Sequence, residues 1–177
     1  QQQQWQAVQQ RNERLQQQNR RAQYRFQEDY MERMRQQRIH LDDDRNHDYD
    51  RDPYFYTAPS YRYRRGGRYY ETNQYGADLL RHAVNYGYEQ GFHTGEADRE
   101  DGWRSNYRDS YAYQDANYGY TGYYVDQDEY NYYFREGFRR GYDDGCGRQN
   151  RYGSHSNGGF SVTVGVLGGI LNFQSLR

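Results

Sequence analysis

The chain has 177 residues, a formal net charge of −1, a mean hydropathy of −1.54 and only 33% hydrophobic residues. This length allows one domain, or one small domain with arms. No stretch reaches the roughly 20 apolar residues of a membrane span, and a single cysteine, Cys146, excludes an intrachain disulfide and any multi-cysteine metal site.

Aliphatic side chains are scarce and unevenly placed. The chain has 15 Leu, Ile and Val residues, of which seven lie in the last 16 positions, against 24 Tyr and 19 Gly. Such a composition is typical of disorder, but the near-zero charge and the 19% aromatic content argue for a folded chain. All 24 basic residues are Arg, which reflects either genomic base composition or dense Arg–Tyr contacts between surfaces.

Residues 1–41 are rich in Gln and lack Gly and Pro. Their apolar residues recur at helical steps of three, four and seven, with Asn12 and Asn19 at two core-like positions. This pattern predicts a long N-terminal helical arm that needs a partner surface, the alternative being a disordered arm. The apolar residues of the stripe are Trp5, Val8, Leu15, Ala22, Phe26, Tyr30 and Met34, and Trp5, Val8 and Leu15 are predicted to be buried in assembly.

Residues 42–75 combine an acidic linker with a Tyr/Arg hairpin. Asp42, Asp44 and Asn46 alternate as at the start of a calcium loop, but the required Gly and terminal Glu are missing, so a solvated linker is favoured. Residues 61–65 and 68–72 flank a Gly pair and read as two strands of a β-hairpin.

Residues 76–146 carry glycines at four-residue spacing on two predicted helices, with a third short helix at 103–118 and a connection at 119–128. An internal repeat offset by 46 residues aligns 89–98 with 135–144. Each mid-helix Gly costs about 1 kcal/mol relative to Ala, so we expect close backbone approach to offset this. The alternative is a run of Gly-Tyr turns without helix. The predicted helix-packing residues are Ala83, Gly87, Gly91, Gly95, Gly137, Gly141 and Gly145.

Residues 147–177 read as a Gly/Ser loop followed by an apolar C-terminal strand. The strand has high β propensity and no charge, so it must be covered by its own helices or by a neighbouring subunit. Its predicted assembly residues are Val162, Val164, Val166, Leu167, Ile170 and Leu171. Together these segments predict a mainly α fold with minor β: a glycine-stripe helical bundle with the arm, one hairpin and this strand.

Catalytic signals are weak. Glu89, His93 and Glu96 have the spacing of metal ligands on one helical face, but Arg139 replaces His93 in the repeat. Cys146 has no neighbouring His in the sequence, and no phosphate-binding loop or dinucleotide fingerprint is present. We therefore expect no enzyme, no cofactor and no metal.

Two kinds of polymer are candidate partners. Residues 61–70 mix Arg with Tyr as in single-strand nucleic-acid binding, but 25 acidic against 24 basic residues leave no broad basic face. We expect no nucleic-acid partner. Glycan is a more natural partner for exposed Tyr and Trp.

Three stretches carry a family resemblance: YYETNQYGADLLR at 69–81, YEQGF at 88–92 and YYFREGFRRGYDDG at 132–145. They resemble uncharacterised exported bacterial proteins rich in Tyr, Gly and Arg, over residues 60–150. The resemblance implies export from a bacterial cell and nothing about activity. The start at Gln1 also predicts a mature N-terminus left by processing.

These observations lead to two principal hypotheses. The first is a structural subunit, secreted to the cell surface or beyond, that self-assembles through its terminal segments into an extracellular filament or matrix. The alternative is a monomeric cell-envelope module that binds glycan or another polymer through Tyr-rich surfaces, with its C-terminal strand folded onto its own domain. A metalloenzyme using Glu89, His93 and Glu96 is a third and weaker hypothesis.

Overall fold

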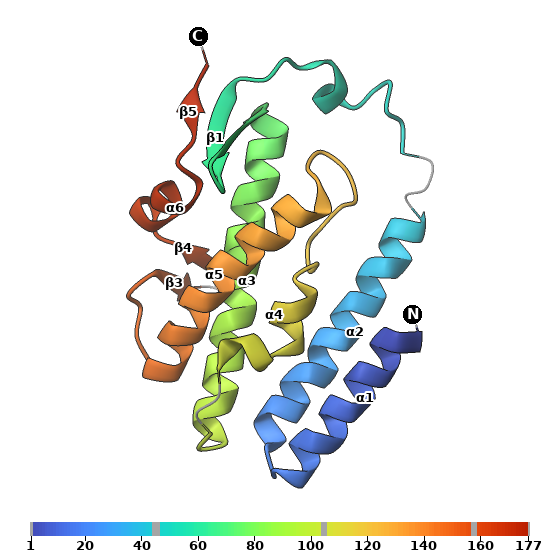
Figure 1. Ribbon diagram of the computed structural model, residues 1–177, viewed down its shortest axis with the longest axis vertical. Coiled ribbons are helices and arrows are strands. Elements are labelled where there is room, and N and C mark those ends of the chain that lie inside the picture. Colours follow the sequence, from blue (N-terminus) through green and yellow to red (C-terminus); the bar gives the residue numbers. More distant parts are fainter. Residues whose placement is uncertain (1, 44–46, 104–105, 157–158, 177) are drawn as a thin grey trace.

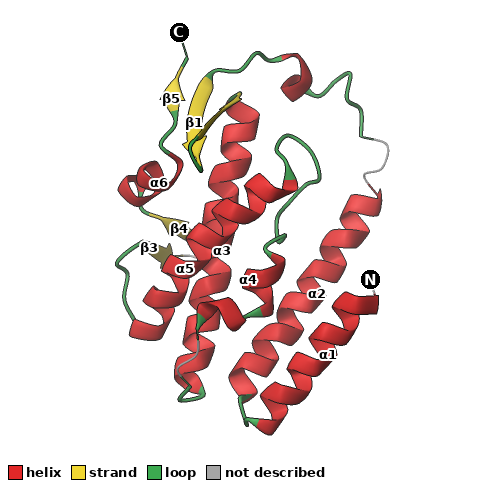
Figure 2. Cartoon of the chain, viewed as in Figure 1, coloured by secondary structure: helices red, strands yellow, loops and turns green. Residues whose placement is uncertain are grey.

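The computed structural model describes residues 2–43, 47–103, 106–156 and 159–176. Two long helices, α3 (Gln74–Glu100) and α5 (Gln127–Gly147), form the centre of the molecule. The N-terminal helices lie on one side of this pair, and short antiparallel strands lie on the other (Figures 1 and 2). The prediction of a mainly α fold with minor β is confirmed.

The N-terminal segment is helical, but it folds back on itself instead of extending. Helix α1 (Gln2–Gln17) and helix α2 (Arg21–Asp43) are separated at Asn19, which adopts a left-handed φ of 56°. Asn tolerates this conformation better than most residues, so the chain reverses there. The prediction of one continuous arm is therefore wrong. Val8 and Leu15 are buried within the molecule, where they help α1 pack on α2.

The segment before α3 contains the predicted hairpin. A short 3₁₀ helix, Pro53–Tyr56, begins at Asp52, whose carboxylate accepts a hydrogen bond from the Tyr54 amide. Strands β1 (Tyr61–Arg65) and β2 (Arg68–Thr72) then pair around Gly66 and Gly67, both at positive φ. The hairpin prediction is confirmed. Of the calcium-loop residues considered above, Asp44 and Asn46 lie outside the described residues.

The glycine stripe forms the seam between α3 and α5. Methyl groups added at Gly87 and Gly91 would lie 2.8 Å from the carbonyl carbons of Phe134 and Phe138. Gly137 and Gly141 meet α3 in the same way, at Val84 and Tyr88. Because both series ascend together, the two helices run parallel, with their backbones in direct contact.

Every predicted packing residue lies on this seam or beside it. Gly95 faces Tyr142, Gly145 faces Phe92, and Ala83 is completely buried. The helix and close-approach predictions are confirmed, and the alternative of Gly-Tyr turns is wrong. The two glycine series are related by 50 residues, since Gly91 corresponds to Gly141 across the seam. The sequence repeat, offset by 46, is therefore one helical turn out of register with the packing.

A long connection returns the chain from the end of α3 to the start of α5. It holds the 3₁₀ turn Tyr107–Asp109 and one short helix, α4 (Tyr111–Asp115). The predicted helix at 103–118 is thus much shorter than expected. Ala116, at φ 56°, ends it.

The C-terminal segment differs most from expectation. Strand β3 (Gly153–Ser156) forms where a loop was expected, and it pairs with β4 (Gly159–Val162), which lies at the start of the expected apolar strand. The apolar run that follows is helix α6 (Val164–Leu171), and β5 (Gln174–Ser175) then pairs with β1. The predicted apolar strand is present only as β4, and the prediction is wrong for residues 164–171, because the valines, leucines and isoleucine there also fit a helical spacing.

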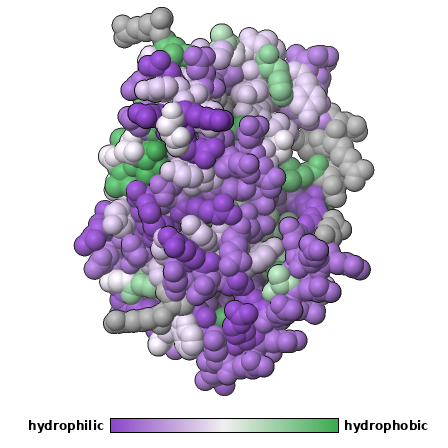
Figure 3. All heavy atoms as spheres, in the orientation of Figure 1, coloured by the Kyte–Doolittle hydropathy of each residue, from purple (hydrophilic) through white to green (hydrophobic). Residues whose placement is uncertain are grey.

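The terminal apolar residues are mostly covered by their own chain. Val162 and Leu171 are buried, while Val166, Leu167 and Ile170 are partly buried against the same core. Val164 is 88% exposed and Trp5 is 59% exposed. A core cluster of buried side chains runs from α2 to α6. Figure 3 shows a mainly hydrophilic face with scattered apolar residues, among which a group lies at the left, where Figure 1 places α6.

Candidate functional site

An aromatic cleft, which we call the tyrosine groove, lies between the residue 49–55 segment, the β1–β2 hairpin and residues 120–129. Its volume is about 500 Å³, within the range of small-molecule and cofactor sites. Strands β1 and β2 lie just before α3, and residues 120–126 lie just before α5. Because α3 and α5 run parallel, these segments, which are distant in sequence, meet at the same end of the helix pair. The aromatic lining of the groove consists of Tyr49, Tyr54, Phe55, Tyr63, Tyr70, Tyr120, Tyr123 and Tyr124.

The aromatic rings of the groove hold one another in place. Tyr54 stacks on Tyr124 with ring centroids 4.4 Å apart, and Tyr123 meets Tyr124 edge-on at 4.8 Å. Tyr49 meets Phe55 edge-on at 4.9 Å. Such pairs contribute about 0.5–1.5 kcal/mol each beyond the area they bury. The groove therefore has walls of fixed ring faces.

A buried carboxylate, Asp52, anchors one wall. It accepts hydrogen bonds from His47 Nε2 at 2.5 Å, from the Tyr124 hydroxyl and from the Tyr54 amide. Burial raises the pKa of Asp52, but these hydrogen bonds outweigh it, so the pKa lies below its usual value. Burial and the Asp52 charge together raise the pKa of Tyr124, which stays a neutral phenol. Asp52 thus ties the linker to the loop before α5.

A second buried carboxylate, Glu129, anchors the opposite wall. It accepts from the Tyr63 hydroxyl at 3.0 Å and from Arg65 Nε at 2.6 Å. Burial, followed by the Glu129 charge, raises the pKa of Tyr63 well above its usual value. Glu71 and Asp126 add two exposed carboxylates. None of the groove-lining residues that the structure describes is basic.

One polar group in the groove wall lacks a partner. Thr72 is 6% exposed, and its hydroxyl makes no hydrogen bond to any described residue. Leaving a buried hydroxyl unsatisfied costs about 1–3 kcal/mol. The hydroxyl is packed against Gly76 at the start of α3, because a methyl group added at Gly76 would collide with it, so it faces the helix and not the groove.

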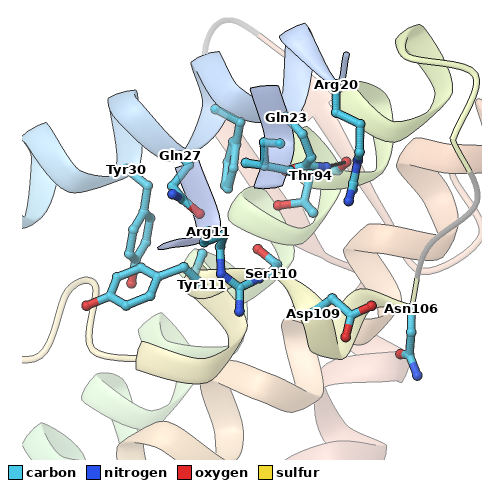
Figure 4. Close-up of a pocket in the computed structure, with 13 residues that line it drawn as sticks. Arg11, Arg20, Gln23, Gln27, Tyr30, Thr94, Asn106, Asp109, Ser110 and Tyr111 are labelled. Carbon is cyan, nitrogen blue, oxygen red and sulfur yellow. Dashed lines mark hydrogen bonds between the residues drawn. The ribbon is translucent and has the colours of Figure 1, made fainter. Parts of the chain in front are cut away.

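A smaller polar cavity lies where helices α1 and α2 meet α3 and the segment before α4 (Figure 4). Arg20 pairs with the fully buried Asp98 at 2.7 Å, and Gln23 donates to the same carboxylate oxygen. The Tyr142 hydroxyl donates to the other oxygen. The cavity volume of about 20 Å³ is room for a water molecule. We interpret this region as the polar joint that docks α2 on α3.

The weak catalytic candidates do not assemble into a site. His93 Nδ1 lies 3.2 Å from Glu96, whereas Glu89 accepts from Gln90. Within the described residues, no three His, Cys, Asp or Glu side chains gather closely enough to hold a metal. Cys146 is half-buried on Gly95, and burial raises the pKa of its thiol.

The Arg-rich hairpin presents a separate surface. Arg62 and Arg64 lie over the exposed Tyr69 ring, at 4.8 and 5.6 Å from its centroid. These guanidinium groups are already occupied by their own aromatic neighbour. That no nucleic acid binds here stays a prediction.

No family model, curated protein or solved structure matches this chain. The resemblance to exported bacterial proteins therefore stays a prediction. None of the described helices is at once long enough and apolar enough to cross a membrane.

Proposed function

We propose that this protein is a binding module whose tyrosine groove holds a segment of glycan. The observation that carries the proposal is a groove of about 500 Å³ walled by aromatic rings and lined by carboxylates. Sugar rings present apolar C–H faces to aromatic rings and hydroxyls to hydrogen-bonding groups. Phenol hydroxyls both donate and accept, and carboxylates accept, so the lining suits both kinds of contact.

The rigidity of the groove also favours binding. Its rings are fixed by mutual stacking and by the Asp52 and Glu129 hydrogen bonds. A pre-organised wall loses little side-chain freedom when a ligand binds. The proposed role is that of a receptor surface, and location at the cell surface or outside the cell is part of the same proposal.

The C-terminal assembly mechanism has lost its main support. It required an uncovered apolar strand, but Val162 and Leu171 are buried in the molecule's own core. Self-assembly retains one observation in its favour, the exposure of Trp5 and Val164. Light scattering across a dilution series distinguishes the two functions: a stable monomer at high concentration supports the binding module, and growing particles support the polymer.

Neighbouring aromatic residues give a matched test of the groove. Phe55 lines it and is 48% exposed, whereas Tyr56 does not line it and is 66% exposed. We would titrate the protein with a panel of neutral and amino-sugar oligosaccharides by calorimetry. Phe55→Ala should weaken binding about tenfold, since a lost aromatic contact is worth about 1.4 kcal/mol. Tyr56→Ala should bind like the wild type. The proposal fails if no oligosaccharide binds, or if both variants behave alike.

A further inference from the structure

Resting on that proposed function, we infer that the tyrosine groove selects glycans that carry protonated amino groups over neutral or acidic ones. The inference stands on the groove's charge. Glu71 and Asp126 are exposed and line it, and none of its described lining residues is basic. Glu129 is neutralised by Arg65, so the excess negative charge lies with the two exposed carboxylates.

The position of Asp126 brings its charge close to the aromatic walls. It is the residue that precedes α5, and it makes no side-chain hydrogen bond to the start of that helix. After burial, the Asp126 charge is the next cause that raises the pKa of both Tyr54 and Tyr120. An ammonium group held against either ring would therefore lie within the field of this carboxylate.

The aromatic rings favour a cation for the same reason that they stack with arginine elsewhere in the molecule. Arg20 lies 4.6 Å from the Trp103 ring centroid, and Arg62 lies 4.8 Å from that of Tyr69. Within the groove, Arg65 lies 5.6 Å from the Tyr70 ring centroid, but no arginine among the described residues lies over Tyr54 or Tyr124. These ring faces offer the negative potential that attracts an ammonium, and it is not neutralised by the protein's own cations.

A sugar suits this groove better than a basic peptide does. In an amino sugar the ammonium is fixed to a rigid ring, so one unit can stack on a tyrosine and meet a carboxylate together. A lysine or arginine side chain would lose more rotamer freedom to reach the same position, because its charge lies at the end of a long flexible chain.

The test compares two oligomers of equal length, about six sugars each: glucosamine and its fully N-acetylated form. Calorimetry at about pH 6 and about 0.05 M salt should show the glucosamine oligomer binding roughly tenfold more tightly. About 0.5 M salt should reduce the difference to roughly twofold, because the carboxylates are exposed. A uronic-acid oligomer should bind more weakly than either.

Two substitutions assign the preference to the groove. Asp126→Asn should reduce it to roughly threefold and leave binding of the acetylated oligomer unchanged, since Asn serves equally well at the start of a helix. Asp128→Asn, at an exposed position outside the groove lining, should change neither. Equal binding of the two oligomers overturns the charge inference but leaves the proposed function standing. Binding of neither oligomer refutes both, and tighter binding of an arginine-rich peptide overturns the amino-sugar assignment.

Discussion

Replacing Gly91 by Ala tests the seam that holds the molecule together. The added methyl would lie 2.8 Å from the Phe138 carbonyl carbon and closer still to its oxygen, whereas ordinary contact begins at 3.4 Å. The helices would have to separate by at least the difference, 0.6 Å. Backbone cannot rotate away as a side chain does, so we expect the upper range of overpacking penalties, about 3 kcal/mol.

Helix propensity works in the opposite direction. Ala is about 1 kcal/mol better than Gly in a helix interior, so Gly91→Ala should lower the free energy of unfolding by about 2 kcal/mol net. Gly168→Ala provides the control: it makes the same change in helix α6, at a position where nothing lies within 4 Å of the added methyl. That variant should gain up to about 1 kcal/mol.

Urea unfolding followed by circular dichroism measures both variants. The expected separation between them is about 3 kcal/mol, a large fraction of the 5–15 kcal/mol typical of a domain. A Gly91→Ala protein as stable as the wild type, or matching Gly168→Ala, would show that the two backbones do not approach as described. A circular dichroism spectrum with native helix content excludes gross misfolding as the cause of a loss.

Three further predictions concern buried groups. Asp98→Ala breaks the buried ion pair with Arg20 and should lower the free energy of unfolding by about 3–5 kcal/mol. Glu100→Ala, whose ion pair is exposed, should lower it by less than about 1 kcal/mol. Urea midpoints that differ little between the two variants would contradict this. Burial and the Asp115 charge raise the pKa of Tyr30, so this phenol stabilises the fold below about pH 10, where unfolded tyrosine begins to ionise, and that stability is lost as pH rises further. The last part of the phenolate absorbance change should coincide with the loss of helix, and complete ionisation in a still-helical protein would refute the assignment. The raised pKa of Cys146 predicts slower alkylation by iodoacetamide at neutral pH in the folded protein than in urea, and equal rates would contradict it.

Local pattern was enough to predict α3, α5 and the first hairpin. The four-residue glycine spacing identified the seam because only glycine, which lacks a side chain, permits such backbone approach. Gly66-Gly67 identified the turn because glycine readily adopts positive φ. Asn19 stood out in the sequence as a polar residue on the apolar stripe, but the sequence did not show that the chain reverses there or which way α1 folds back. That direction depends on where the surface of α3 lies, which no local pattern records.

The groove was less predictable than the fold. Tyr-rich stretches at 49–56 and 118–124 were evident, yet nothing local indicated that they share a wall. Asp52 looked like one more residue of a solvated acidic linker, but it is buried and binds Tyr124. The run 164–171 was ambiguous because short apolar segments fit either a strand or a helix, and packing on the core decides between them.

The parallel pairing of α3 and α5 has a kinetic consequence. Gly87 meets Phe134, so the first seam contact closes a loop of 47 residues. Closing such a loop is entropically unfavourable and must precede the packing that rewards it. During synthesis, α3 therefore leaves the ribosome with its glycine face unmatched, and it waits for the whole return segment before its partner exists. The loop that supplies the groove wall is also the tether whose length sets that delay.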